Sequence, residues 1–351
     1  VRNLKYIYNV MDIVRKSNGF TVSKKGKKTL RFKYLDKKTK TRIRDVKTIK
    51  YIESIKIPPA YKKVIISKNS RSKILAIGED DKKRKQYIYN PKFVEKQVDV
   101  KFKELILFGK YIKRIRQDMR KVIAETARGK RDILSKETLI SLVLFLVDNC
   151  HFRIGCEKYK VLYKTYGVTT LNKSHFTKIK DKFDVEFVGK KGVVNKAQVK
   201  NKEVCGVLNE LCKKNSGDYL FYSKESDKDK VRINEKHVNN FLKKYNENIT
   251  VKMYRTWKAN YILLREVLQY PLPENSEDSK KNLAEIIKST AKKMHHTTSI
   301  SKKSYMNNKI MDLYTNNPTE FKKVLMKFKK SNGTLPSIDR ILSLLLKYFF
   351  F

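Results

Sequence analysis

The sequence is short of acidic residues. It has 35 Asp and Glu residues against 82 Lys and Arg residues, so its 351 residues carry a formal net charge of +47 at pH 7. An excess of this size favours a polyanionic partner: nucleic acid, an anionic membrane or an acidic protein. The membrane is the weakest candidate, because the basic residues are spread along the whole chain rather than concentrated in one amphipathic helix.

Long hydrophobic runs are also lacking. The longest, Leu139 to Val147 with Ser141 inside it, is far shorter than the ~20 residues that a membrane-spanning helix needs. Charges are scattered through the N-terminal segment VRNLKYIYNVMDIVRK, and no small-residue cleavage site is present, so we expect no secretory signal. These absences predict an intracellular protein that makes no use of a membrane.

Paired cysteines, phosphate loops and metal motifs are missing as well. The four cysteines show no C-x-x-C spacing and are expected to be reduced thiols, not a disulfide framework or a zinc site. The chain has no G-x-x-x-x-G-K-[ST] loop and no carboxylate or histidine cluster with metal-ligand spacing. We therefore expect neither a cofactor nor a bound metal.

What is present suffices for folded domains. Hydrophobic residues make up 40% of the chain, and its length favours two domains over one. Residues 1–98 contain strand-like segments, separated by turns at Pro58-Pro59 and Asn90-Pro91. These segments are residues 29–35, 64–66, 74–77 and 86–89. The first domain is therefore predicted to be small and β-rich.

Residues 99–351 show a different periodicity. Apolar residues recur at helical spacing over 102–115 and are followed by helical segments at 120–127 and 139–147. A hairpin is expected at 185–194, with turn residues at its centre, and a polar connector at 271–281. The predicted fold class is α+β, with a small β-rich N-terminal domain and a larger, mainly α domain.

Four segments of the larger domain together contain the side chains that phosphodiester transesterification requires. They are 152–159 (FRIGCEKY), 187–190 (FVGK), 252–261 (KMYRTWKANY) and 295–305 (HHTTSISKKSY). In phosphodiester transesterification a tyrosine oxygen can attack phosphorus while two guanidinium groups bind the non-bridging oxygens. A histidine can donate a further hydrogen bond, and a lysine can protonate the departing alkoxide.

These segments resemble those of the type IB DNA topoisomerases, particularly the compact enzymes of poxviruses and other large DNA viruses and their bacterial relatives. The N-terminal domain resembles the same family at 57–61 (IPPAY), 76–78 (AIG) and 83–89 (KRKQYIY). Several motifs in the family's order are far more specific than any single one. The resemblance implies the catalytic-domain fold that topoisomerases IB share with tyrosine recombinases.

The resemblance assigns roles to individual residues. It implies that Tyr305 is the nucleophile, forming a 3′-phosphotyrosyl bond and freeing a 5′-hydroxyl group. Arg153 and Arg255 correspond to the residues that stabilise the transition state. Residues implied to contact DNA come from both domains: Gln86, Tyr87, Tyr89, Lys158, Tyr159 and Lys252.

Two of the implied roles have adjacent alternatives. Lys190 corresponds to the general acid for the 5′ oxygen, but Lys191 is its neighbour. His296 corresponds to the donor to a phosphate oxygen, but His295 stands where the family often has glycine. Only the spacing within each motif favours Lys190 and His296.

The implied activity is relaxation of supercoiled duplex DNA by a monomer that closes around the duplex as a clamp. One strand is nicked, its free end swivels, and the strand is religated. Because the phosphotyrosine keeps the phosphodiester energy, neither ATP nor a metal is chemically required. A viral protein of this kind is expected in the virion and the host-cell cytoplasm, and any other wherever the genome resides.

Two other functions compete with this interpretation. A tyrosine recombinase or integrase uses almost the same side chains, but it typically has H-x-x-R where this chain has Lys252-x-x-Arg255. Recombinases also lack the I-P-P-A and K-Q-Y-x-Y segments of the N-terminal domain. A non-catalytic basic DNA-binding protein would account for the charge of +47 but not for the residues grouped with Tyr305.

Overall fold

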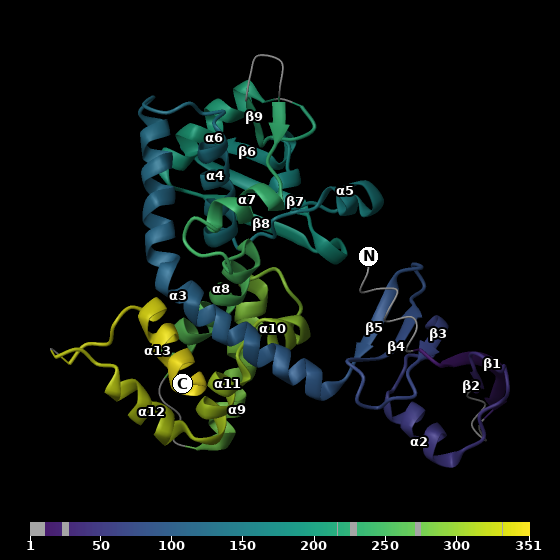
Figure 1. Ribbon diagram of the computed structural model, residues 1–351. Helices are drawn as coiled ribbons and strands as arrows, with labels where there is room; N and C mark the ends of the chain where they lie inside the picture. The colour runs from purple at the N-terminus through teal and green to yellow at the C-terminus, as the bar shows by residue number, and fades with distance from the viewer. Residues whose placement is uncertain (1–10, 23–27, 216, 225–229, 271–274, 332) are drawn as a thin grey trace. The chain divides into compact units, whose positions relative to one another are not determined.

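The computed structural model describes residues 11–22, 28–215, 217–224, 230–270, 275–331 and 333–351 (Figure 1). The chain divides into two compact units, Val1–Val100 and Lys101–Phe351. Helix α3 (Pro91–Ala127) contains the division between them. The boundary expected from the sequence, between residues 98 and 99, falls in the same helix.

The first unit is built on an antiparallel sheet with the strand order β2-β1-β3-β4-β5. Its elements are β1 (Ile13–Val22), β2 (Lys28–Asp36), α2 (Val46–Ser54), β3 (Lys62–Ile66), β4 (Ile74–Glu79) and β5 (Lys85–Tyr89). The prediction of a β-rich first domain is confirmed, and all four expected strands are present. Strand β1 and helix α2 were not predicted, because their apolar residues are interrupted by lysine, arginine and polar residues.

A buried arginine organises the loop at residues 57–61. Arg15 of β1 is 7% exposed, and its guanidinium group donates hydrogen bonds to the carbonyl oxygens of Pro58 at 3.1 Å and Tyr61 at 2.5 Å. Gly78 of β4 lies against the same loop, since a Cβ atom there would stand 3.1 Å from the Cβ atom of Tyr61. The segments 57–61 and 76–78 of the sequence are therefore in contact.

The second unit is mainly helical, as predicted. After α3 its helices are α4 (Lys136–Asn149), α5 (Glu157–Tyr163), α6 (Lys202–Lys214), α7 (Glu235–Leu242), α8 (Val251–Val267), α9 (Ser276–Lys293), α10 (Thr298–Ser304), α11 (Asn308–Asn316), α12 (Pro318–Lys327) and α13 (Ile338–Phe350). A small sheet joins β6 (Phe176–Ile179), β7 (Lys182–Val188) and β8 (Val194–Val199), and a second pairs β9 (Tyr222–Lys224) with β10 (Lys230–Arg232). No helix among the described residues is long and apolar enough to cross a membrane.

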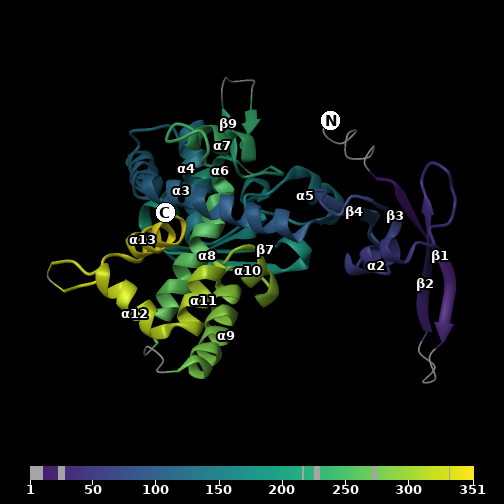
Figure 2. The ribbon, with the colours of Figure 1, turned by 60° about the horizontal axis from the view of Figure 1, so that its bottom comes forward.

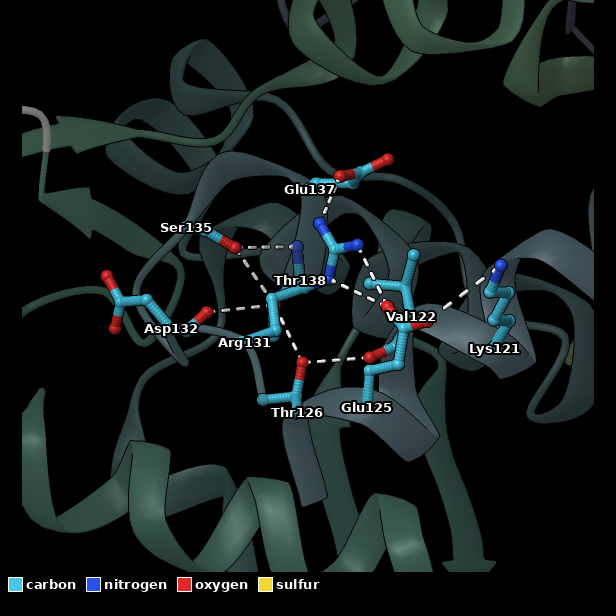
Figure 3. Close-up of polar contacts among 9 residues, drawn as sticks. All are labelled: Lys121, Val122, Glu125, Thr126, Arg131, Asp132, Ser135, Glu137 and Thr138. Atoms are coloured by element: carbon cyan, nitrogen blue, oxygen red, sulfur yellow. Dashed lines mark hydrogen bonds and ion pairs between the residues drawn. The ribbon is translucent and has the colours of Figure 1, made fainter. Parts of the chain in front are cut away.

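The apolar run at 139–147 forms most of α4, which is buried nearly all round and packs against α7 and α8. Its start is fixed by the polar corner in Figure 3, where Arg131 pairs with Glu125 and Glu137. Beneath this pair the hydroxyl groups of Thr126 and Thr138 lie 2.9 Å apart. The corner anchors the start of α4, whose C-terminal end leads to Arg153.

Some expected boundaries were wrong. The helical segments 102–115 and 120–127 belong to the single helix α3. The hairpin at 185–194 exists as β7 and β8, but β6 adds a third strand. Of the expected connector, residues 271–274 lie outside the described part, and 276–281 are helical. Helix α9 begins there because the Asn275 side chain accepts hydrogen bonds from two backbone N–H groups of the first turn.

Candidate active site

Helix α8 carries Arg255 into the interior of the second unit. The residue is 5% exposed, and its guanidinium group donates to the carbonyl oxygens of His151 and of Met294, the latter at 2.9 Å. Burial, followed by the charge of Arg153, lowers the pKa of Arg255 to about 10. No carboxylate is among the charged groups that shift the pKa of Arg255, so within the described residues its charge is not offset by a neighbouring acidic side chain.

Tyr305 lies beside Arg255 at the C-terminal end of α10. Its ring stacks on the imidazole ring of His296, with centroids 4.3 Å apart and planes inclined by 25°. The Arg255 Cζ atom stands 5.7 Å from the centroid of the Tyr305 ring. The structure therefore brings together the tyrosine, the histidine and one arginine of the predicted site.

The charges around Tyr305 change its acidity. Burial by itself would raise the pKa of the phenol, but Arg255, Arg153 and Lys190 together outweigh burial and lower it. A lower pKa makes the phenolate, which is the nucleophilic form, easier to reach near neutral pH. Arg153 and Lys190 are therefore within electrostatic range of the Tyr305 phenol.

The two neighbouring histidines face different surroundings. His296 contacts Arg255 through Nε2, and its Nδ1 lies 3.2 Å from the Ser301 hydroxyl group. Burial, followed by the charge of Arg255, lowers the pKa of His296 and keeps the ring neutral. His295 instead has its Nε2 3.3 Å from the Cys150 carbonyl oxygen, away from Tyr305. The geometry thus favours His296 over His295.

Arg153 is held by backbone packing in the loop after α4. Gly155 has a φ of +97°, and a Cβ atom on Gly167 would lie 2.5 Å from the Gly155 nitrogen. The Arg153 carbonyl oxygen also accepts a hydrogen bond of 2.8 Å from the Val168 backbone. The contribution of Gly167 was not predicted, because it depends on contact between two glycines that are distant in sequence.

Lys190 and Lys191 occupy the turn between β7 and β8, and both are exposed. Gly189 closes the turn with a 2.8 Å hydrogen bond to the Val193 carbonyl oxygen. Lys191 has a left-handed φ of +66°, whereas Lys190 is among the cations that lower the pKa of Tyr305. Lys190 thus influences the acidity of Tyr305, and the choice between the two lysines stays a prediction.

The residues expected to contact DNA in the second unit are on its surface. Lys158 and Tyr159 are exposed on α5, and Lys252 is exposed in the first turn of α8. Lys101 lies near Lys252 and donates a 3.2 Å hydrogen bond to the Ser304 carbonyl oxygen, just before Tyr305. Burial, followed by the charge of Lys252, lowers the pKa of Lys101 to about 8.

The residues expected to contact DNA in the first unit lie on the edge strand β5. The Tyr87 and Tyr89 rings stack with centroids 6.3 Å apart. The Gln86 amide donates a 2.9 Å hydrogen bond to Asp80. Tyr89 is 44% exposed, so its ring is available to a ligand. Contact of these residues with DNA stays a prediction.

One positioning residue was not predicted. Asn260, fully buried on α8, donates from its amide nitrogen to the carbonyl oxygens of Thr256 at 2.7 Å and Tyr305 at 2.9 Å. Its amide oxygen accepts a 2.7 Å hydrogen bond from the backbone N–H of Asn307. Asn260 thus fixes the chain on both sides of the tyrosine. In the sequence, the feature that could have indicated Asn260 is its spacing of four residues from Thr256, which places two polar side chains on one face of a helix.

The cysteines and acidic residues do not form a further centre in the described part of the chain. All four cysteines are free, with Cys150, Cys205 and Cys212 buried and Cys156 exposed. Among the residues that the structure describes, no group of three or more His, Cys, Asp or Glu residues could hold a metal ion.

Comparisons with known proteins identify the sequences that this chain resembles. Residues 90–332 match the family model of the eukaryotic DNA topoisomerase I catalytic core, and residues 31–80 match that of the bacterial DNA topoisomerase IB N-terminal domain. The chain is 32% identical over 283 residues to DNA topoisomerase 1B of Acanthamoeba polyphaga mimivirus, covering 78% of this chain and 82% of that protein. It is 25% identical over 274 residues to DNA topoisomerase 1B of Vaccinia virus (strain Copenhagen), covering 75% of this chain and 80% of the relative.

Proposed function

This chain belongs to the type IB DNA topoisomerase family, and we propose that Tyr305 is the nucleophile of its strand-cleavage reaction. The enzyme is an isomerase that relaxes supercoiled duplex DNA by transient cleavage of one strand and religation. The observation that carries the residue assignment is the contact of the Tyr305 ring with His296 and its proximity to Arg255. The effect of Arg153, Arg255 and Lys190 on the pKa of this phenol supports the roles proposed for these three residues.

In the cleavage step the Tyr305 oxygen, having passed its proton to water, attacks phosphorus. The bond from phosphorus to the 5′ oxygen breaks as the 3′-phosphotyrosyl bond forms. Arg153 and Arg255 bind the non-bridging oxygens, whose negative charge increases in the transition state. Burial of Arg255 supports this role, because the electrostatic interaction is stronger where water is excluded.

Lys190 gives a proton to the departing 5′ oxygen. In religation the 5′-hydroxyl group attacks phosphorus, Lys190 takes the proton back, and Tyr305 leaves as the phenolate. The exposed position of Lys190 in a short turn between paired strands supports this role, since its side chain can reach a ligand from a fixed backbone. His296 completes the set by hydrogen bonding to a phosphate oxygen. Burial and the neighbouring positive charges hold His296 neutral; an incoming phosphate offsets those charges, and protonation of Nε2 then makes it a donor.

We also propose that the protein works as a monomer clamping duplex DNA, with residues 1–98 closing over one groove. Its large positive charge and the exposed Lys158, Tyr159 and Lys252 support binding to the DNA backbone. Its similarity to viral DNA topoisomerases supports activity on DNA inside cells. We further propose that the protein is located in the virion and in the cytoplasm of the infected cell.

Trapping of the covalent intermediate tests the assignment of Tyr305. A nicked duplex that loses the short strand on cleavage should give a stable protein–DNA adduct, and peptide mapping should place the DNA on Tyr305. Tyr305→Phe should form no adduct and relax no plasmid, while its duplex affinity is retained, because binding rests on many Lys and Arg contacts.

Tyr261→Phe is the matched control, since Tyr261 packs against the same small cluster of Ala259, Ile262 and Met294 as Tyr305. It should form the adduct normally. An adduct on any residue other than Tyr305 would show that the nucleophile has been misassigned.

A further inference from the structure

The C-terminal helix α13 lies beyond the part of the chain that matches the catalytic-core family. The match ends at residue 332, and α13 begins at Ile338. Its buried residues are Ile341, Leu342, Ser343, Leu345 and Leu346. The helix packs against α8, and Figures 1 and 2 both show it in yellow beside α8 and the middle of α3. Residues after the family's core are therefore built into the second unit.

Asp339, in the first turn of α13, joins this helix to two others. Its Oδ2 atom lies 2.8 Å from Nη1 of Arg116 on α3. Its Oδ1 atom accepts a 2.7 Å hydrogen bond from the indole N–H of Trp257 on α8. The Trp257 ring is 1% exposed, so this hydrogen bond is formed in the interior. Trp257 is two residues from Arg255 on the same helix.

A second series of contacts leads from Asp339 to Arg255 through Arg116. The other side of the Arg116 guanidinium group binds both oxygens of Asp148, at 2.6 and 3.0 Å. The Asp148 carbonyl oxygen lies 3.1 Å from Nδ1 of His151. The His151 carbonyl oxygen in turn accepts a hydrogen bond from the Arg255 guanidinium group. Asp339 is thus connected to Arg255 along two different routes.

The packing around this network leaves little room for rearrangement. A Cβ atom on Gly109 of α3 would lie 2.7 Å from both the Ser343 hydroxyl oxygen and an indole carbon of Trp257. Helices α3, α8 and α13 therefore meet in close contact at this position. Asp148 is 4% exposed, and the two carboxylates keep Arg116 charged despite its burial. Loss of one carboxylate would leave the buried guanidinium group less well neutralised.

We propose that Asp339 is a positioning residue for strand cleavage, which acts by fixing the Arg255 guanidinium group relative to Tyr305. This inference rests on the proposed roles of Tyr305 and Arg255. The Trp257 contact fixes the orientation of α8, and the Arg116–Asp148 pair fixes the loop that receives Arg255. Helix α13, which follows the matched core in the sequence, is then a part of the catalytic architecture.

The test is the rate of single-turnover cleavage of the nicked duplex at saturating enzyme. Asp339→Asn preserves the size of the side chain and an acceptor for Trp257 but places an uncharged amide against Arg116. Cleavage should slow about 10- to 100-fold, because misplacement of a catalytic group by up to about 1 Å has effects of this size. Duplex affinity should be unchanged. Asp312→Asn, which alters an exposed carboxylate on α11, is the matched control and should cleave normally.

A double-mutant cycle separates positioning from a general loss of stability. In an Arg255→Ala background Asp339→Asn should have little further effect, because the group that it positions is absent. The inference is wrong if Asp339→Asn cleaves at the wild-type rate. It is also wrong if Asp339→Asn lowers the cleavage rate by the same factor in the wild-type protein and in Arg255→Ala. If Asp339→Asn fails to fold, Asp339→Glu, which displaces the carboxylate by one methylene group, is judged by the same two criteria. Absence of a Tyr305 adduct in the wild-type protein would instead contradict the proposed function.

Discussion

The imidazole ring of His296 lies nearly parallel to the phenol ring of Tyr305, with the two centroids 4.3 Å apart. The intervening chain makes this contact possible. His295 has a φ of +53°, Thr297 accepts a hydrogen bond from Ile300 as the N-terminal cap of α10, and the helix then leads to Tyr305. Both rings face the buried Arg255, so one guanidinium group can influence both the nucleophile and the hydrogen-bond donor.

The identity of the general acid can be decided between Lys190 and Lys191. Lys190→Ala should slow cleavage by about 10²- to 10⁴-fold, the usual contribution of general-acid catalysis. A substrate with sulfur at the 5′ bridging position should restore much of the rate, because a thiolate leaves without a proton. The same substrate should restore Arg255→Ala far less, because Arg255 acts on the non-bridging oxygens.

Lys191→Asn is the control for this experiment. Asparagine tolerates the left-handed backbone at this position, where φ is +66°. The variant should cleave close to the wild-type rate. If sulfur rescues Lys191→Asn and not Lys190→Ala, the general acid is Lys191.

His151 should make the fold sensitive to acid. Burial, followed by the charge of Lys258, lowers the pKa of His151 to about 3, whereas an unfolded histidine titrates near a pH of about 6.5. Between these values the unfolded state binds a proton that the folded state does not, so the free energy of unfolding falls as the pH falls. Below pH ~6 this histidine should contribute a slope approaching about 1.4 kcal/mol per pH unit.

His151→Asn should remove this contribution, and asparagine suits the left-handed φ of +59° at this residue. Denaturant unfolding of both proteins at several pH values between about 7 and 5 measures the difference in slope. Equal slopes would mean that His151 is not held neutral in the folded protein.

Asn260→Ala should affect stability and cleavage together. It removes the partners of the Tyr305 carbonyl oxygen and the Asn307 backbone N–H, and each buried group left unsatisfied costs about 1–3 kcal/mol. Cleavage should slow because the chain that carries Tyr305 is no longer fixed to α8. Asn240→Ala, at an exposed position on α7, should change the free energy of unfolding by less than about 0.5 kcal/mol. Wild-type behaviour of Asn260→Ala in both assays would contradict the positioning role.

Relaxation should depend steeply on salt and not on ATP or chelator. Each phosphate neutralised by Lys or Arg contributes about −0.9 to the slope of log K against log salt concentration. Plasmid relaxation and duplex binding, measured over a range of salt concentrations with and without EDTA, provide the check. A requirement for a nucleotide or a divalent ion would contradict a mechanism in which side-chain cations and the phosphotyrosine suffice.

Local patterns predicted much of the fold. The apolar run at 139–147, with Ser141 inside it, predicted a helix, and short apolar runs predicted strands at 64–66 and 74–77, because these signals depend on neighbouring residues. The connector expected at 271–281 was wrong for residues 276–281, which are helical. Its polar composition was interpreted as a loop, although Asn275 followed by Ser, Glu and Asp is also a good helix start.

The chemical groups of the site and the family that they indicate could be read from the sequence, because motif order and residue type are encoded locally. Tertiary structure alone decided how His295 and His296 differ, since the backbone turn sends one ring toward Cys150 and the other toward Tyr305. It also decided the positions of Arg15, Asn260 and Asp339. Each of these buried or partly buried polar groups needs hydrogen-bond partners, and those partners come from segments far away along the chain.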